Sequence, residues 1–132
     1  MGDRVLVDTS AWIEFFRKGD SHVAGVVDQL LHNDLIAIPG VVRAEILQGA
    51  RQHKEYDSLA KLIDALPRLN DPDDLWEQVS QLGFALRLKG LGGLGIPDLI
   101  IAVHARHHEA RVLTLDRHFR AMADVVPLEL LA

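Results

Sequence analysis

Four acidic residues with the potential for chemistry are spread over nearly the whole chain: Asp8, Glu45, Asp98 and Asp116. Asp8 and Asp116 each close an apolar run of the kind that forms a buried strand. Asp98 opens a strongly apolar helical stretch, and Glu45 lies on a predicted helix. Carboxylates beside buried strands are costly to remove from water, so they need a compensating partner. A divalent metal ion is the simplest such partner.

The chemistry of a shared carboxylate site follows from its electrostatics. Two carboxylates about 4 Å apart repel by roughly 4 kcal/mol at an effective dielectric constant near 20. Without a cation, some of them would take up protons near neutral pH. Mg²⁺ or Mn²⁺ removes this conflict, because both ions favour oxygen ligands from carboxylates and water. A metal held in this way activates water and polarises a phosphodiester, so the expected reaction is in-line phosphodiester hydrolysis.

Each acid taken singly also has a structural explanation. Asp98 follows a Gly-rich loop and could cap a helix, and Asp116 could cap the helix after its strand. Glu45 could lie on a solvated helix face. Asp8 is harder to explain, because the two hydroxyl residues that follow it could cap the first helix without it. The structural explanation therefore needs four independent coincidences, and we favour one acidic site.

Length and composition limit the class of protein. The 132 residues are enough for one domain, expected over 1–132, and 48% hydrophobic with 25% charged residues is typical of a soluble globular protein. No apolar run reaches transmembrane length, and no secretory leader is expected at the N-terminus. The absence of cysteine excludes thiolate sites and fits a reducing cytoplasm. The formal net charge of −5 argues against nucleic-acid binding driven mainly by phosphate neutralisation, although bound metal would offset part of it.

The elements that must position the acids alternate between strands and helices. We predict strands at Arg4–Asp8, Leu35–Ile38, Leu66–Leu69, Arg111–Leu115 and Val125–Leu128. We predict helices at 11–17, with Ser10 as the N-cap, at 22–32, from Pro39, at 54–66, from 71 to 88, at 97–109 and, briefly, after Asp116. Such alternation implies crossover units and a mostly parallel sheet with helices on both faces. Ligands of such sheets bind beyond the carboxyl ends of the strands, where Asp8 and Asp116 would lie.

Four segments of the chain resemble a known family. The opening Val5-Leu6-Val7-Asp8-Thr9-Ser10-Ala11-Trp12-Ile13 resembles the start of PIN-domain ribonucleases, in particular the VapC-type toxins of bacterial toxin–antitoxin systems. The other three acids lie in segments that resemble the later acidic motifs of this family, in the same order: Pro39 to Gly49, Ile96 to Ala102 and Leu113 to Phe119. The resemblance covers the whole chain at about the expected length, and four motifs together are specific.

The resemblance implies a fold, an activity and partners. The fold would be a PIN-like, three-layer α/β/α sandwich with a mostly parallel central sheet. The activity would be that of an endoribonuclease dependent on Mg²⁺ or Mn²⁺, acting as a toxin on a tRNA or rRNA loop to inhibit translation. The partners would be the RNA substrate, a second copy of the chain in a homodimer, and a cognate VapB-like antitoxin that occupies the active site. No membrane is implied, and the location would be the cytoplasm.

The resemblance also assigns roles to residues. Carried over by position, the metal-binding and catalytic acids are Asp8, Glu45, Asp98 and Asp116. Three further positions are supporting candidates: Ser10, Thr114 and His118. The two hydroxyls could hold a metal-bound water, although capping or strand packing explains them equally well. His118 departs from the family, which often has an acidic or amide residue there, and it could contact substrate phosphate.

Two other functions remain open at this point. The first is an aspartyl-phosphate phosphatase or phosphotransferase with Asp8 as the nucleophile, although that chemistry usually wants a second Asp where this chain has Ser10. The second is a non-catalytic PIN-like binding module, which the complete acidic set disfavours.

Two more sequence features lead to structural predictions. His104, His107 and His108 share one predicted helix but lack the HExxH pattern of a zinc site, so we predict surface or helix-end histidines. The Gly-rich stretch 90–95 lacks the Gly-Lys-Ser/Thr sequence of a P-loop, and we expect it to form a mobile wall beside Asp98.

Overall fold

The computed structural model of the chain describes residues 3–17 and 19–131. Its strands are short: β1 (Val5–Val7), β2 (Ile38–Pro39), β3 (Arg68–Leu69) and β4 (Arg111–Leu113). Its helices are α1 (Thr9–Arg17), α2 (His22–His32), α3 (Gly40–Gln48), α4 (His53–Asp64), α5 (Leu75–Leu88), α6 (Ile96–His107) and α7 (Arg117–Ala123). The ends of the expected 1–132 domain, residues 1–2 and 132, lie outside this description.

The strands that the structure describes pair only in parallel. β1 pairs with β4 and β2 pairs with β3, and a bridge between Val5 and Ile36 connects the two ladders. The order across the sheet is therefore β3, β2, β1, β4, with the first strand of the chain at its centre. This confirms the parallel sheet predicted from the alternation of elements.

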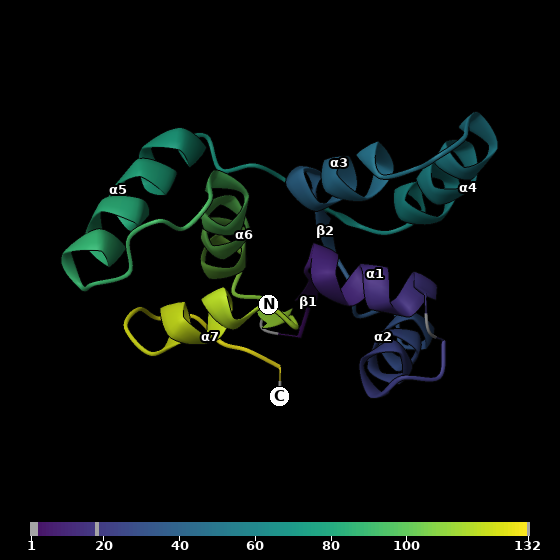
Figure 1. Cartoon of the computed structure of the whole chain (residues 1–132), viewed down its shortest axis with the longest axis horizontal. Coiled ribbons are helices and arrows are strands. Elements are labelled where there is room, and N and C mark those ends of the chain that lie inside the picture. The colour runs from purple at the N-terminus through teal and green to yellow at the C-terminus, as the bar shows by residue number, and fades with distance from the viewer. Residues whose placement is uncertain (1–2, 18, 132) are drawn as a thin grey trace.

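The helices cover both faces of this sheet. In Figure 1, α5, α6 and α7 gather on one side of the strands, whereas α1 to α4 lie on the other. The strand order explains this division, because the chain moves from β1 toward β3 through α1 to α4 and returns to β4 through α5 and α6; crossovers of the same hand that run in opposite directions lie on opposite faces. The predicted three-layer α/β/α fold is confirmed. No helix in the described part of the chain has both the length and the apolar character needed to cross a membrane.

The core explains why the strands hold the site in place. The three residues of β1 are at most 1% exposed, and α6 is buried from Leu99 to Ala105 without interruption. Gly83 on α5 makes room for this packing, since a Cβ built there would lie 3.0 Å from Leu99 Cδ1. The burial of β1 and of the body of α6 therefore fixes the positions from which Asp8 and Asp98 extend, although the first residues of α6, such as Ile96, are exposed.

Two predictions about the strands and helices are wrong. The last strand does not form at Val125–Leu128; instead, Leu130 bridges Val112 in parallel, and Pro127 has no N–H to donate to a ladder. Ser10 is not the N-cap of the first helix. That helix already begins at Thr9, because the Asp8 carboxylate accepts the Ala11 N–H at 3.2 Å and so takes the capping role.

The prediction of surface or helix-end histidines is wrong for His104. Its side chain is fully buried on α6, with Nε2 3.0 Å from Asp71 Oδ1 and no hydrogen bond of good geometry at either ring nitrogen. His107 is exposed and His108 is half-buried at the end of the helix, as predicted. Burial lowers the pKa of His104 below its ordinary value of 6.5, and the carboxylate of Asp71 opposes this effect only in part.

We expect His104 to make the fold sensitive to acid. As the pH falls below 6.5, the unfolded chain takes up a proton at this position before the folded chain does, so stability present above pH 6.5 is lost. For one group the limiting slope is about 1.4 kcal/mol per pH unit. Urea unfolding at pH 7.5 and pH 5.5 should show a smaller loss for His104→Gln than for the unsubstituted protein, whereas the exposed His32→Gln should behave like the unsubstituted protein. Equal losses in all three proteins would contradict this assignment.

Candidate functional site

Asp8 is the most buried of the four acids. Val7 is in register with Leu113 at the end of the β1–β4 ladder, so Asp8 lies level with Thr114. Asp8 is 3% exposed, and its carboxylate accepts three protein hydrogen bonds. Ser10 Oγ and the Ala11 N–H donate to Oδ1 at 2.6 and 3.2 Å. Thr114 Oγ1 donates to Oδ2 at 2.6 Å. These bonds fix the carboxylate in one orientation.

The electrostatics of Asp8 show an incompletely compensated charge. Burial raises the pKa of Asp8, and the three hydrogen bonds from Ser10, Thr114 and Ala11 lower it without cancelling that effect. The nearby charge of Asp116 raises the pKa further. Ionised Asp8 is therefore held at a cost, which a cation beside it would remove.

Thr114 connects Asp8 to Asp116. Its hydroxyl donates to Asp8 and accepts the Asp116 N–H at 2.9 Å. The side chain of Asp116 accepts the His118 N–H at 2.9 Å and so caps α7. The capping explanation for Asp116 is thus correct, but it describes only one of its two oxygens. Asp116 remains about a third exposed and can still face a ligand.

Asp98 lies in the first turn of α6 but does not cap it. The N-cap position is Gly95, and no side chain caps this helix. Instead, Asp98 Oδ2 lies 3.2 Å from His118 Nδ1. Burial raises the pKa of Asp98; the hydrogen bond with His118 lowers it, and the charges of Asp116 and Asp8 raise it. Like Asp8, Asp98 carries a charge that lacks full compensation.

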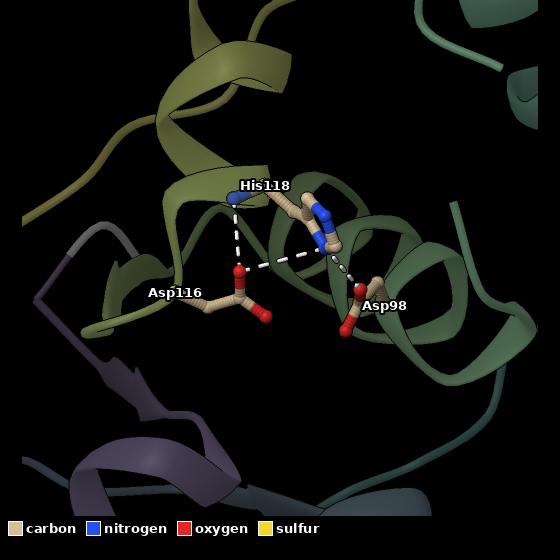
Figure 2. A group of neighbouring side chains, drawn as sticks. All are labelled: Asp98, Asp116 and His118. Atoms are coloured by element: carbon tan, nitrogen blue, oxygen red, sulfur yellow. Dashed lines mark hydrogen bonds and ion pairs between the residues drawn. The ribbon is translucent and has the colours of Figure 1, made fainter. Parts of the chain in front are cut away.

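The structure brings three side chains into one compact set. Figure 2 shows Asp98 from α6 facing Asp116 and His118 at the start of α7. One ligand atom from each of these three residues lies within 4.8 Å of the others. His118 Nδ1 is also 3.5 Å from Asp116 Oδ1. Asp8 and Glu45 are outside this set, although the charge of Asp8 acts on Asp98 and is itself affected by Asp116.

Glu45 is held by a residue that sequence reasoning missed. Thr9 Oγ1 donates to Glu45 Oε1 at 2.7 Å, which connects the first turn of α1 to α3 across 36 positions of sequence. Glu45 is half-buried, and the contact with Thr9 gives it a role beyond that of a purely solvated helix face. Thr9 stands directly after Asp8, and its neighbour Ser10 also contacts a carboxylate. The Asp-Thr-Ser run was the available signal, but nothing local indicated that Thr9 would reach α3.

The donors of the site fit a divalent cation. No lysine or arginine among residues 3–17 and 19–131 forms an ion pair with Asp8, Glu45, Asp98 or Asp116; His118 is the one side chain of basic type paired with these acids there. Carboxylate oxygens suit Mg²⁺ and Mn²⁺, and an imidazole nitrogen suits the softer first-row ions. Asp98, Asp116 and His118 could therefore hold an ion, with Asp8 beside them.

Comparison with known proteins agrees with this geometry. The model of the PIN domain family matches residues 5–125. The chain belongs to the PIN-domain family. Within that family, it is 34% identical to Ribonuclease VapC11 of Mycobacterium tuberculosis over 128 residues, which cover 95% of this chain and 96% of the relative. It is 32% identical to Ribonuclease VapC21 of the same species, over 95% of this chain and 90% of that one. The resemblance to VapC-type PIN domains is confirmed.

Solved structures show the same PIN fold. The structure of VapBC2 from Rickettsia felis, bound to a DNA fragment from its promoter, matches with a TM-score of 0.77 and 22% identity, over 96% of both chains. VapBC-1 from nontypeable Haemophilus influenzae matches with a TM-score of 0.76 and 22% identity, over 96% of both chains. At these identities the likeness concerns the fold alone. The catalytic and metal-binding roles of the individual acids stay predictions.

Proposed function

We propose that this PIN-domain chain is a metal-dependent endoribonuclease and the toxin of a toxin–antitoxin pair. The observation that carries the proposal is the compact set of Asp98, Asp116 and His118, with buried Asp8 beside it, at the carboxyl edge of the parallel sheet. Kinship with the VapC ribonucleases supports it, because the chain spans almost the whole length of those relatives. The chain would then act as a single nuclease domain over 1–132.

We assign a separate task to each part of the site. Asp98 and Asp116 would hold Mg²⁺ or Mn²⁺, with Asp8 as a further ligand. The bound ion would supply an activated water and stabilise charge on the phosphodiester. Ser10 and Thr114 would orient the Asp8 carboxylate through the hydrogen bonds already described. The prediction that the two hydroxyls also hold a metal-bound water stays a prediction.

Glu45 would take a different role from the other acids. It lies outside the compact set, and among residues 3–17 and 19–131 its hydrogen-bond partner is the Thr9 hydroxyl, which is on Oε1. We therefore propose that Glu45 Oε2 accepts the proton released by the attacking water. A carboxylate held at one oxygen and free at the other has the fixed orientation that a general base requires.

The partners follow from the chemistry and the kinship. The substrate would be a single-stranded loop of a tRNA or rRNA, because site-specific RNA recognition mostly targets exposed loops, and its cleavage in the cytoplasm would inhibit translation. A VapB-like antitoxin would neutralise the enzyme by covering the site. The similar solved structures include VapBC proteins and a toxin–antitoxin complex from Klebsiella pneumoniae, which supports such a partner.

The aspartyl-phosphate alternative gains nothing from the geometry. Ser10 stands where that chemistry usually wants a second acid, and its hydroxyl donates to Asp8 Oδ1 at 2.6 Å. Oδ1 also accepts the Ala11 N–H, and Oδ2 accepts the Thr114 hydroxyl, so these hydrogen bonds account for the carboxylate without a nucleophilic role. The fully formed acidic edge likewise disfavours the non-catalytic binding module.

Cleavage of total cellular RNA tests the proposed function. Purified, antitoxin-free protein would be incubated with RNA in Mg²⁺, in Mn²⁺ and in EDTA. We expect a few discrete fragments in either metal and none in EDTA. End-mapping of the fragments would identify the loop. Cleavage that continues in EDTA would overturn the metal dependence, and a folded protein without cleavage in either metal would count against the nuclease.

We also propose that a second copy of the chain docks on α5. This helix exposes an apolar stripe on the side away from the core, with Trp76 66%, Phe84 64% and Leu88 72% exposed. These residues stand at multiples of four positions, so they share one side of the helix. Charged residues mark the two ends: Asp73, Asp74 and Glu77 at the beginning, and Arg87 and Lys89 at the end. Two such helices packed antiparallel about a twofold axis would match acidic ends to basic ends and bury both stripes.

We expect the protein to behave as a dimer of twice 14.7 kDa in light scattering after size exclusion. Phe84→Glu should raise the dimer dissociation constant at least about ten-fold, because a charge enters the apolar centre of both copies of the stripe. Tyr56→Glu provides the matched control, since Tyr56 is an exposed aromatic residue on α4, at 43% exposure. A dimer that survives Phe84→Glu, or one lost equally in the control, would place the interface elsewhere.

A further inference from the structure

The imidazole of His118 lies beside two acids of the site. Its Nδ1 lies 3.2 Å from Asp98 Oδ2 and 3.5 Å from Asp116 Oδ1, as Figure 2 shows. If the ring is neutral with its proton on Nε2, the Nδ1 lone pair faces both carboxylates and is repelled by them. The arrangement is favourable when Nδ1 carries a proton, in the neutral Nδ1–H tautomer or in the charged ring, because the ring then donates to Asp98 Oδ2. A metal ion shared with the acids could take the place of that proton.

The distances between His118 Nδ1 and the two carboxylate oxygens are close to those between neighbouring ligand atoms of a bound metal ion. In an octahedral shell with bonds of about 2.1 Å, neighbouring ligand atoms are about 3.0 Å apart and opposite ones about 4.2 Å apart. The distances from Nδ1 to the two carboxylate oxygens are slightly longer than such an edge, and all three ligand atoms fit within 4.8 Å. Small side-chain rotations would bring them onto one ion.

A backbone hydrogen bond, and not the imidazole, fixes the position of His118 at the start of α7. The His118 N–H donates to Asp116 Oδ1, so the start of α7 sets the position of His118 whatever its side chain is. The side chain is 57% exposed, which leaves it accessible to an ion from solvent. The buried core therefore does not depend on this ring, whose contacts are with the acids Asp98 and Asp116.

We infer that His118 is a nitrogen ligand of the metal site and biases it toward Mn²⁺ over Mg²⁺. The inference rests on the proposed metal-dependent function and deepens it. Mg²⁺ prefers oxygen ligands and water. The first-row divalent ions, including Mn²⁺, are softer than Mg²⁺ and accept an imidazole ligand more readily. A site with only carboxylates from Asp8, Asp98 and Asp116 would discriminate little between Mn²⁺ and Mg²⁺. One imidazole adds selectivity without adding negative charge.

Metal binding measured without RNA tests this inference. Tag-free protein would be titrated with Mn²⁺, with free Mn²⁺ followed by electron paramagnetic resonance and Mg²⁺ added as a competitor. We expect the ratio of the Mg²⁺ to the Mn²⁺ dissociation constant to fall at least about ten-fold in His118→Asp. The ratio is informative because the extra charge of the aspartate strengthens binding of both ions. His53→Asp, at the exposed start of α4, is the matched control and should leave the ratio unchanged.

A spectroscopic readout identifies the nitrogen directly. Bound Mn²⁺ should show electron spin echo modulation from a coordinated ¹⁴N in the unsubstituted protein and lose it in His118→Asp. Binding that disappears in Asp98→Asn, with no nitrogen modulation and an unchanged ratio in His118→Asp, would overturn the inference and leave the proposed function intact. Tighter Mn²⁺ binding in His118→Ala would also overturn it, since the ring would then be a competing cation. Failure to bind either ion, or binding independent of Asp98, would instead refute the metal site itself.

Discussion

Asp98→Asn is expected to reduce RNA cleavage by at least about a thousand-fold, which corresponds to ~4 kcal/mol of barrier, while leaving the fold intact. Asparagine has nearly the shape of aspartate, so the packing of α6 should persist. What disappears is the charge of a carboxylate in the set with Asp116 and His118. The remaining donors would bind the metal ion more weakly and in a shifted position. The phosphodiester would then lose its main source of charge stabilisation. Cleavage of a mapped loop substrate, measured in Mg²⁺ and in Mn²⁺, provides the test.

Although Asp98→Asn should lower activity, it should raise the stability of the metal-free protein. Burial and the charge of Asp116 raise the pKa of Asp98, so its contribution to stability is greatest below the ordinary pKa of 3.8 and is lost as the pH rises through the folded-state pKa. At pH 7 without metal, the ionised carboxylate is therefore a cost that Asn removes, and the variant should melt at a slightly higher temperature. With Mn²⁺ at about 100 times its dissociation constant, the unsubstituted protein should gain about 2.7 kcal/mol and the variant almost none.

Asp57→Asn is the matched control for both measurements, because Asp57 is exposed on α4. It should retain full cleavage and the full metal-induced stabilisation. Full activity of Asp98→Asn would contradict the proposed catalytic site. An inactive variant that is still stabilised by Mn²⁺ like the unsubstituted protein would move the metal away from Asp98.

The broad plan of the molecule could be predicted because it depends on local patterns. The apolar runs that become β1 and β4 are short and end at acidic residues, and parallel strands place such ends at one edge. The same logic predicts that Asp8 and Asp116 lie at neighbouring strand ends, as the pairing of β1 with β4 places them. Asp98 followed from the Pro97 signal for a helix start, which the structure confirms.

The details that failed depend on contacts between distant segments. Periodicity could not show that His104 would be buried, because α6 is covered on more than one side and its burial is continuous rather than amphipathic. Thr9 and Glu45 are 36 positions apart in the sequence, so no local sequence pattern could predict their hydrogen bond. Capping preference favoured Ser10, whereas the buried Asp8 carboxylate took the role because it needed donors. At this site the requirements of a buried charge outweighed local propensity.

Thr114→Val is expected to weaken both metal binding and cleavage by about 10- to 100-fold, the range typical of residues that orient metal ligands. Thr114 donates to Asp8 Oδ2 and accepts the Asp116 N–H, so one hydroxyl fixes acids on two neighbouring strand ends. Valine keeps the shape and removes both bonds. The carboxylate of Asp8 would gain freedom to turn, and the Asp116 N–H would lose its acceptor.

The pH dependence separates this orienting role from simple packing. The hydrogen bond from Thr114 lowers the pKa of Asp8 against the opposing effect of burial, so removing the bond raises that pKa further. More Asp8 is then protonated at a given pH, and the acid limb of the cleavage profile should move to higher pH in Thr114→Val. Thr114→Ser keeps the hydroxyl and should restore both the limb and the Mn²⁺ affinity. If Thr114→Ser is as impaired as Thr114→Val, the methyl group matters and the effect is packing. If Thr114→Val matches the unsubstituted enzyme, Asp8 does not need this donor, and the hydrogen bonds from Ser10 and Ala11 suffice to orient it for catalysis.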